Sequence, residues 1–182
     1  MSTLTLAQRV LAIEGALGEV PHAFGGALAL AYYAEPRATI DIDLNLFVPA
    51  ERFTDVADPL QRLGAASDDP SVAALVRRDG QARVMWDSTP IDLFFAYDPF
   101  HDAAKAARKI VPFGAHTIPI LSAEHLMVCK VVFNRPKDWV DIDSMLGAEP
   151  DLCVPEVLRW VGRLAGDEDP RYNRIAFVLT RH

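Results

Sequence analysis

The sequence contains few cysteines and no long apolar run, and each shortage excludes a class of protein. Its two cysteines, Cys129 and Cys153, form no CxxC pair, so we expect buried free thiols in a reducing cytoplasm rather than a disulfide. No apolar run reaches the roughly 20 residues that a membrane-spanning helix needs. The first residues, MSTLTLAQRVLAIEGAL, lack the basic and apolar regions of a signal peptide. These absences predict a cytoplasmic protein with no membrane partner.

Positive charge is also in short supply. The 182 residues include 18 Lys and Arg against 25 Asp and Glu, a net charge of −7 that repels polyanions. This balance counts against broad, sequence-blind binding of nucleic acids. The hydrophobic share of 51% and the charged share of 24% are those of an ordinary globular protein, and a chain of this length can bury a substantial core.

Hydrophobic periodicity and turn-forming residues divide the chain into helices and strands. We expect helices at 4–17, 26–34, 50–63 and 100–108, from Ser122 to about Asn134, from Pro136 on, and twice after Asp151. We expect strands at 40–48, 82–87, 90–97 and 109–119, with a hairpin around DSTP. This order predicts an α/β (α+β) fold, in which a mixed sheet is flanked by helices and a helical part lies at the C-terminal end.

Two aspartates, Asp41 and Asp43, occupy alternate positions of the otherwise apolar strand IDIDLNLFV. Side chains alternate along a strand, so both carboxylates point the same way, about 7 Å apart. Such carboxylates raise each other's proton affinity unless a cation sits between them, and hard oxygen ligands suit Mg²⁺. The alternative is a solvated strand edge, which the surrounding apolar residues disfavour.

A third aspartate, Asp92, lies in the apolar stretch PIDLFFAY. If that strand lies beside 40–48, three carboxylates converge and can hold divalent ions that activate an attacking oxygen. Upstream, Gly25 and Gly26 allow backbone amides to approach a phosphate closely, ahead of a helix N-terminus. The alternatives are a charge at a strand end for Asp92 and a simple helix-starting turn for the glycine pair.

The glycine pair, the Asp-Ile-Asp strand and Asp92 resemble the signature of the DNA polymerase β nucleotidyltransferase superfamily, over residues 21–97. The stretch EPRATIDIDLNL is further similar to the AbiEii-like nucleotidyltransferases, the toxins of type IV toxin–antitoxin systems. The later stretch LMVCKVVFNRPKDWVDIDSML extends this similarity to about residue 147. The resemblance implies a nucleotidyltransferase core at 1–120, with a helical subdomain at 121–182 packed on it.

The resemblance also implies an activity and its ligands. Asp41, Asp43 and Asp92 would be the metal ligands and catalytic carboxylates, with Mg²⁺ or Mn²⁺ as cofactor and a nucleoside triphosphate as substrate. Some relatives transfer nucleotides to tRNA ends, so tRNA or another RNA end is a candidate acceptor and a cognate antitoxin a candidate partner.

Other residues are candidates for the same site. Lys130 and Glu124 are the only formally charged residues from Ile118 to Asn134, so Lys130 either extends to solvent or points into a charged site as a point charge for triphosphate. Arg37 and Thr39 lead into the acidic strand; Arg37 can meet triphosphate oxygens and Thr39 can hold the start of the strand, or both belong to a surface loop.

A second Asp-Ile-Asp, at 141–143, lies in a predicted helix, where positions i and i+2 do not share a face. We therefore expect no metal pair there. Asp138 and Asp141 do share a face, so one of them can anchor Lys130 or Arg135 or assist as a base, and we take Asp141 as a catalytic candidate.

Three functions compete on the sequence alone. The first is a Mg²⁺-dependent nucleotidyltransferase that acts on a hydroxyl of RNA, protein or a small molecule. The second is a non-catalytic binding module with the same fold, for instance an antitoxin; three intact aspartates count against it. The third, a DxD glycosyltransferase, is disfavoured by the short chain and by the glycine pair ahead of the strand.

Overall fold

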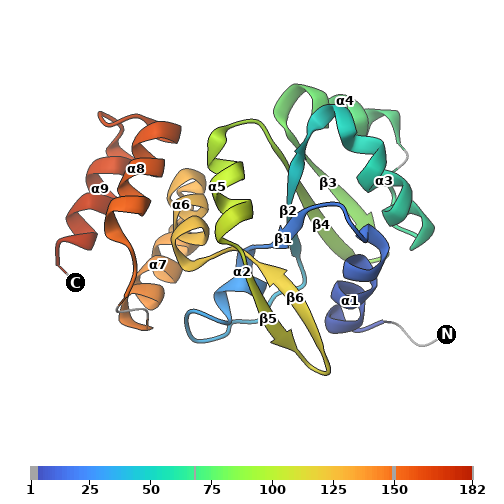
Figure 1. Cartoon of the computed structure of the whole chain (residues 1–182), viewed down its shortest axis with the longest axis horizontal. Coiled ribbons are helices and arrows are strands. Elements are labelled where there is room, and N and C mark those ends of the chain that lie inside the picture. The colour runs from blue at the N-terminus through green and yellow to red at the C-terminus, as the bar shows by residue number, and fades with distance from the viewer. Residues whose placement is uncertain (1–3, 68, 149–150, 182) are drawn as a thin grey trace. The chain divides into compact units, whose positions relative to one another are not determined.

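The computed structural model describes residues 4–67, 69–148 and 151–181 (Figure 1). The chain forms two compact units. The sheet unit comprises the described residues up to Leu28 together with Ala38–Ile120, and the helical unit comprises Ala29–Arg37 and the described residues from Leu121 on. None of the helices in the described ranges is long and apolar enough to cross a membrane.

A six-stranded mixed sheet organises the sheet unit, in the order β3-β4-β2-β1-β6-β5. Its strands are β1 (His22–Phe24), β2 (Ile42–Pro49), β3 (Gln81–Trp86), β4 (Thr89–Ala96), β5 (Lys109–Phe113) and β6 (His116–Ile120). Its helices are α1 (Leu6–Leu17), α3 (Phe53–Arg62), α4 (Pro70–Asp79) and α5 (Pro99–Ala107), with the 3-10 turn η1 (Ala50–Arg52); α2 (Gly26–Leu30) leads into the helical unit.

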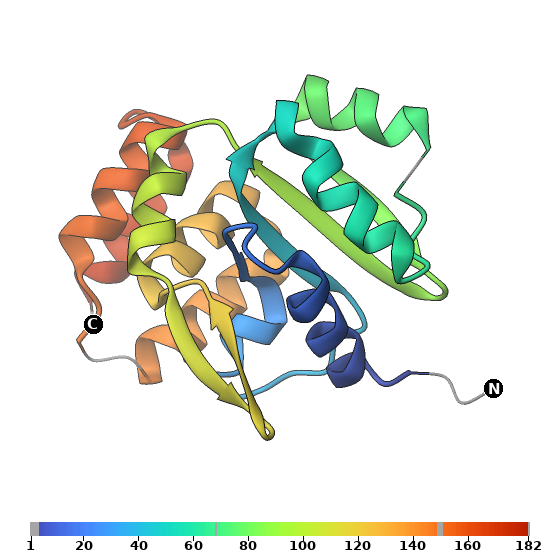
Figure 2. The same ribbon diagram turned by 45° about the vertical axis from the view of Figure 1, so that its right-hand side comes forward.

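Around the aspartates, three neighbouring strands have one covered face and one partly exposed face, although Asn45 and Phe47 further along β2 are buried. In β3 every second residue is buried, and in β2 and β4 the residues beside the aspartates are buried while Asp43 and Asp92 are half-buried. We call the side that carries these aspartates the open face. Figure 2 shows the long β3–β4 hairpin running alongside β2. The alternation sorts apolar side chains into the core and leaves the charged ones together on the open face.

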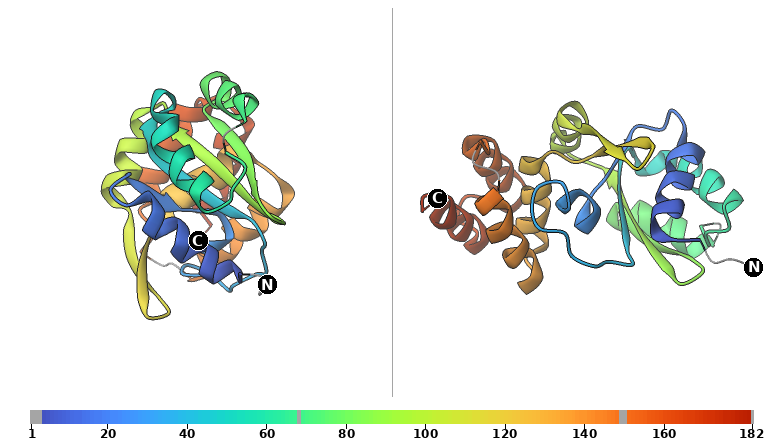
Figure 3. Two further views of the ribbon diagram at one scale, coloured as in Figure 1. Left: turned by 90° about the vertical axis from the view of Figure 1, so that its right-hand side faces the viewer. Right: turned by 90° about the horizontal axis from the view of Figure 1, so that it is seen from below.

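The helical unit is built around α6 (Ala123–Phe133), which packs against α7 (Pro136–Ala148), α8 (Val154–Ala165) and α9 (Pro170–Leu179) (Figure 3). Ser122 caps the start of α6, and Asn134 ends it in the left-handed conformation. Nearly every side of α6 is buried, as expected for a helix that is apolar all round.

Most predicted elements are confirmed within a few residues, including the hairpin, the bounds of α6 and Pro136 at the start of α7. The predicted strand 109–119 is wrong: Gly114 adopts a positive φ of 63° and turns the segment into the β5–β6 hairpin. The sequence interpretation also missed the short strand β1 and the helix α4. Both cysteines are free, as expected, but neither is buried: Cys129 is partly exposed and Cys153 is exposed.

We predict that Ser122→Ala lowers the free energy of unfolding by about 1–2 kcal/mol, because a lost N-cap leaves orphan amides at the helix start. Ser122 is buried, and its hydroxyl accepts from the His125 amide and contacts the His125 ring at 2.8 Å. Urea unfolding provides the measurement. Ser144→Ala, at an exposed position of α7, is the control and should leave stability nearly unchanged; equal losses in both variants would contradict the capping role.

Candidate active site

Sheet register brings two of the predicted aspartates together. Asp43 of β2 and Asp92 of β4 are direct partners in a parallel strand pair, and Arg83 of β3 is the direct partner of Asp92 in the antiparallel hairpin. Partners in a register share a face, so the three side chains form a row across three strands of the open face.

Asp41 adjoins this row, just before β2 begins and on the same side as Asp43. The Thr39 hydroxyl accepts from the Asp41 amide at 3.1 Å, which fixes the chain where it approaches the strand. Asp41 Oδ2 lies 3.9 Å from Arg83 Nη2, and its side chain is one-third exposed. We call Asp41, Asp43 and Asp92 the aspartate cluster.

Arg83 is the cation of this cluster. Its Nε and Nη2 donate to Oδ1 and Oδ2 of Asp92, both at 2.7 Å, in a bidentate pair. These hydrogen bonds outweigh partial burial and raise the pKa of Arg83 above its ordinary value, and the charges of Asp41 and Asp43 act in the same direction. One guanidinium therefore offsets part of the repulsion among three carboxylates.

The glycine pair, which directly follows β1, supports the cluster. The Gly25 amide donates to the Asp43 carbonyl at 2.9 Å. Gly26 has a φ of +53°, and a Cβ there would lie 1.8 Å from Asp43 Oδ2. Glycine is therefore required at position 26 for two reasons: the backbone has a positive φ, and the Asp43 carboxylate packs where a Cβ would lie. The phosphate contact expected of this pair stays a prediction.

The donor chemistry of the cluster suits a hard divalent cation. Three carboxylates provide oxygen ligands, and Gly26 has no side chain that would displace the Asp43 carboxylate packed against it. Within the described residues, no group of three or more His, Cys, Asp or Glu side chains is arranged to hold a metal ion as the side chains stand. Both oxygens of Asp92 accept hydrogen bonds from Arg83.

The other charged candidates come together within the helical unit. Lys130 of α6 donates to Asp141 Oδ2 of α7 at 2.6 Å, and Arg37 donates to both Asp141 oxygens at 3.0 Å. The side chains of Lys130 and Asp141 are each 5% exposed, so Lys130 does not extend to solvent. The buried carboxylate of Asp141 thus forms ion pairs with two cationic side chains.

Burial by itself raises the pKa of Asp141, but hydrogen bonds from Arg37 and Lys130 and their charges outweigh it and hold that pKa below its ordinary 3.8. A carboxyl whose folded pKa is lowered stabilises the fold at pH values above its unfolded pKa. The contribution is lost as the pH falls through the folded pKa.

Asp138, Asp143 and His22 belong neither to the aspartate cluster nor to the Lys130–Asp141 pair. Asp138 is fully buried and accepts from the Arg135 backbone and side chain. Asp143 is exposed, two positions from Asp141 and on another face, as expected for this second Asp-Ile-Asp. His22 is buried and bonds to the Val20 carbonyl and to Glu14, as a structural histidine does.

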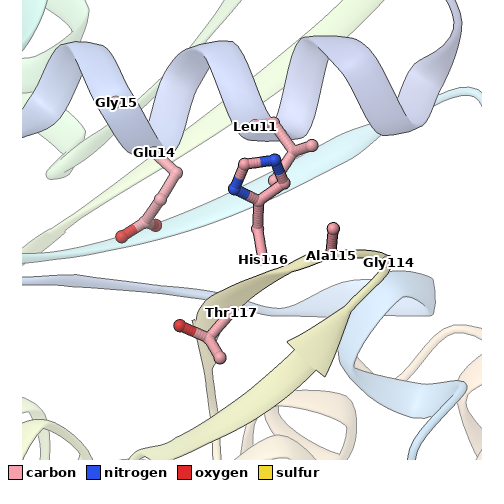
Figure 4. Close-up of a pocket in the computed structure, with 7 residues that line it drawn as sticks. All are labelled: Leu11, Glu14, Gly15, Gly114, Ala115, His116 and Thr117. Carbon is pink, nitrogen blue, oxygen red and sulfur yellow. The ribbon is translucent and has the colours of Figure 1, made fainter.

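A separate hollow of about 630 Å³ lies beside α1 and the β5–β6 turn (Figure 4). Glu14 of α1 and His116 of the hairpin line it, together with small and apolar residues. It includes no residue of the aspartate cluster.

Arg83 is the site residue that the sequence interpretation missed. The signal was present, since Arg83 and Asp92 face each other once the hairpin is folded with Asp87 and Ser88 as its two connecting residues. The predicted strand bounds placed the turn one residue later, which pairs Arg83 with a different residue.

Comparison with known proteins decides the family. The family described as nucleotidyl transferase AbiEii toxin, type IV TA system, matches residues 16–177. The chain belongs to the AbiEii nucleotidyltransferase toxin family. No curated protein matches it. This AbiEii family member is a nucleotidyltransferase, which confirms the enzyme class predicted from the sequence.

Solved structures agree on the fold. The solution structure of the antibiotic-resistance factor ANT(2'')-Ia is similar with a TM-score of 0.62 at 18% identity, covering 97% of each chain. The crystal structure of ANT(2'')-Ia in complex with adenylyl-2''-tobramycin gives 0.59 at 16% identity, covering 88% of this chain and 97% of the other. An antigenic nucleotidyltransferase-like protein from Paracoccidioides brasiliensis gives 0.54 at 16% identity, covering 97% and 88%. The predicted mixed α/β nucleotidyltransferase fold is confirmed.

We predict that Gly26→Ala destabilises this AbiEii protein more than Gly18→Ala does. Both glycines have nearly the same positive φ, 53° and 54°, but a Cβ at Gly18 meets nothing within 4 Å. Each variant should lose about 1 kcal/mol from backbone strain, and Gly26→Ala should lose more because it displaces Asp43. Thermal unfolding of the two variants gives the comparison. Equal losses would show that the Asp43 contact is unimportant.

We predict that removing the charge of Asp141 lowers the free energy of unfolding more than removing that of its buried partner Lys130. Asp141→Asn leaves Lys130 buried without a carboxylate and should cost about 3 kcal/mol at neutral pH. Lys130→Met should cost less, because Asp141 keeps its bidentate partner Arg37. As the pH falls from the ordinary 3.8 through the lowered pKa of folded Asp141, the gap between wild type and Asp141→Asn should shrink, since the unfolded carboxyl binds its proton first. Unfolding measured from pH 7 to pH 3 checks both statements, and a pH-independent gap would contradict the second.

Proposed function

We propose that this AbiEii protein transfers a nucleotide from a nucleoside triphosphate to a hydroxyl acceptor in a reaction that depends on Mg²⁺. The observation that carries the proposal is the row formed by Asp43, Asp92 and Arg83 on the open face, with Asp41 beside it. Carboxylates gathered in this way need cationic charge, and oxygen donors of this kind suit Mg²⁺ better than transition metals.

Each residue of the cluster has a proposed task. Asp41 and Asp43 hold divalent ions, and Asp92 completes the set and orients the acceptor hydroxyl. Bound ions would offset the charge of the triphosphate and favour ionisation of the attacking oxygen. Gly26 keeps the space beside Asp43 free of a side chain. Catalysis on this proposal is positioning and electrostatic stabilisation, the terms that dominate transfer of phosphorus groups.

The tasks expected of the other residues rest on the family resemblance. Arg37 and Lys130 are proposed to bind triphosphate oxygens, and Asp141 to hold these two cations in place. The contacts within the helical unit support the last task, because Asp141 binds both cations at hydrogen-bonding distance. Gly25 and Thr39 are proposed to support the phosphate-binding segment through backbone contacts.

The acceptor is proposed to be an RNA end, tRNA first, as the resemblance to type IV toxins implies, and a cognate antitoxin is the proposed partner. A second acceptor class, a small hydroxylated cation, is favoured by the net charge of −7, which attracts cations and repels RNA. The structurally similar ANT(2'')-Ia was solved in complex with adenylyl-2''-tobramycin, the nucleotidylated form of such a molecule. Cytoplasmic location remains part of the proposal.

We predict that Asp43→Asn and Asp92→Asn each lower the transfer rate at least a hundredfold, since each removes a charged ligand from the reaction centre. The assay incubates the protein and Mg²⁺ with each α-labelled nucleoside triphosphate, and offers total RNA or tobramycin as acceptor. Asp143→Asn is the matched control, an exposed aspartate of the second Asp-Ile-Asp, and should retain wild-type rates. Wild-type rates in Asp43→Asn, or full activity in excess EDTA, would contradict the proposal.

A further inference from the structure

Arg83 occupies the carboxylate of Asp92, which a metal ion bound to the aspartate cluster would need. Its guanidinium occupies both oxygens of Asp92 at 2.7 Å, and the same Nη2 lies 3.9 Å from Asp41. An ion bound by Asp92 would lie within a few ångströms of this guanidinium, and like charges at such distances repel strongly at the reduced dielectric of a protein surface.

The Arg83 side chain is also able to move away from Asp92. Its side chain is 54% exposed, against 20% for that of Asp92, and it projects from the edge strand β3 on the open face. The long, solvated side chain can turn about its rotatable bonds without disturbing the sheet. Asp92, on the inner strand β4, is the fixed partner of the pair.

A triphosphate provides the anion that a displaced guanidinium needs. Arginine forms bidentate pairs with phosphate oxygens as readily as with carboxylates. An exchange of Arg83 from Asp92 to a phosphate would free Asp92 for the metal and add one contact to the triphosphate. Nothing is lost in the exchange, because every charge keeps a partner.

We infer that Arg83 is a positioning residue that couples metal binding to triphosphate binding. In the free protein it substitutes for the metal on Asp92 and weakens the affinity for a divalent ion alone. When metal and triphosphate arrive together, Arg83 transfers to the phosphates and Asp92 accepts the metal. This inference rests on the proposed function, since it takes the aspartate cluster to be the metal site. By linkage, the two ligands then strengthen each other's binding equally.

The test is calorimetric titration of Arg83→Gln with two probes, Mn²⁺ alone and preformed Mn²⁺–tripolyphosphate, which needs no knowledge of the preferred base. Arg83→Gln should bind Mn²⁺ alone on the order of tenfold more tightly than wild type, because the competing cation is gone. It should bind Mn²⁺–tripolyphosphate on the order of tenfold more weakly, because one phosphate contact is lost. A higher affinity for Mn²⁺ alone together with a lower affinity for Mn²⁺–tripolyphosphate is the result that the exchange predicts.

Two further variants control for charge and for folding. Arg78→Gln removes another bidentate arginine, paired with Asp79 at 2.8 and 2.6 Å outside the cluster, and should leave both affinities unchanged. Arg83→Lys keeps the charge and should restore most of the wild-type behaviour. Melting temperatures confirm that each variant is folded.

The outcomes separate this inference from the proposed function. If wild type binds Mn²⁺–tripolyphosphate and Asp43→Asn does not, the metal site stands. Equal affinities of wild type and Arg83→Gln for both probes would then overturn the role of Arg83 alone. A change in Arg78→Gln as large as in Arg83→Gln would also overturn it, since net charge would explain the effect. If no variant binds either probe, the proposed function and the inference both fail.

Discussion

The arrangement of residues around the aspartate cluster depends on one constraint, the electrostatic repulsion among three carboxylates on one face of the sheet. Asp43 and Asp92 are partners in a parallel register, and Asp41 joins them from the start of β2. Such a group is stable only with cationic charge close by. Arg83 provides some of that charge from the neighbouring strand, and Gly26 gives Asp43 the space to sit against the backbone. The same need for a counter-charge makes this face a suitable site for divalent ions.

Around Asp141, in the helical unit, the local balance of charges is the opposite. There a single buried carboxylate, Asp141, is paired with two cations, Lys130 and Arg37. Two positive charges against one negative charge leave an excess that suits an anionic ligand, in keeping with the triphosphate roles proposed for both cations. The buried charges are tolerable because every pair is hydrogen-bonded at short range. Each unit thus keeps charges that a purely structural core would avoid.

Much of the fold was accessible from the sequence, because strong local signals and burial agree. Ser122, Asn134 and Pro136 marked both ends of α6 and the start of α7 correctly, and apolar residues around Asp43 and Asp92 identified their strands. Local patterns do not determine pairing between strands. The pairing of Arg83 with Asp92 depends on which two residues form the turn between β3 and β4, and a shift by one residue changes it. The β5–β6 hairpin depends on the backbone conformation of Gly114. The close approach of Gly26 to Asp43 is a tertiary contact that spacing alone does not reveal.

The most direct measurement of the central claim is a crystal structure of the protein with Mn²⁺ and a non-hydrolysable nucleoside triphosphate, using the anomalous signal of manganese to locate the ion. We expect manganese within about 2.5 Å of carboxylate oxygens of Asp43 and Asp92, with the Arg83 guanidinium moved from Asp92 to the phosphates. Manganese bound away from the aspartate cluster, while Arg83 keeps both oxygens of Asp92, would contradict it.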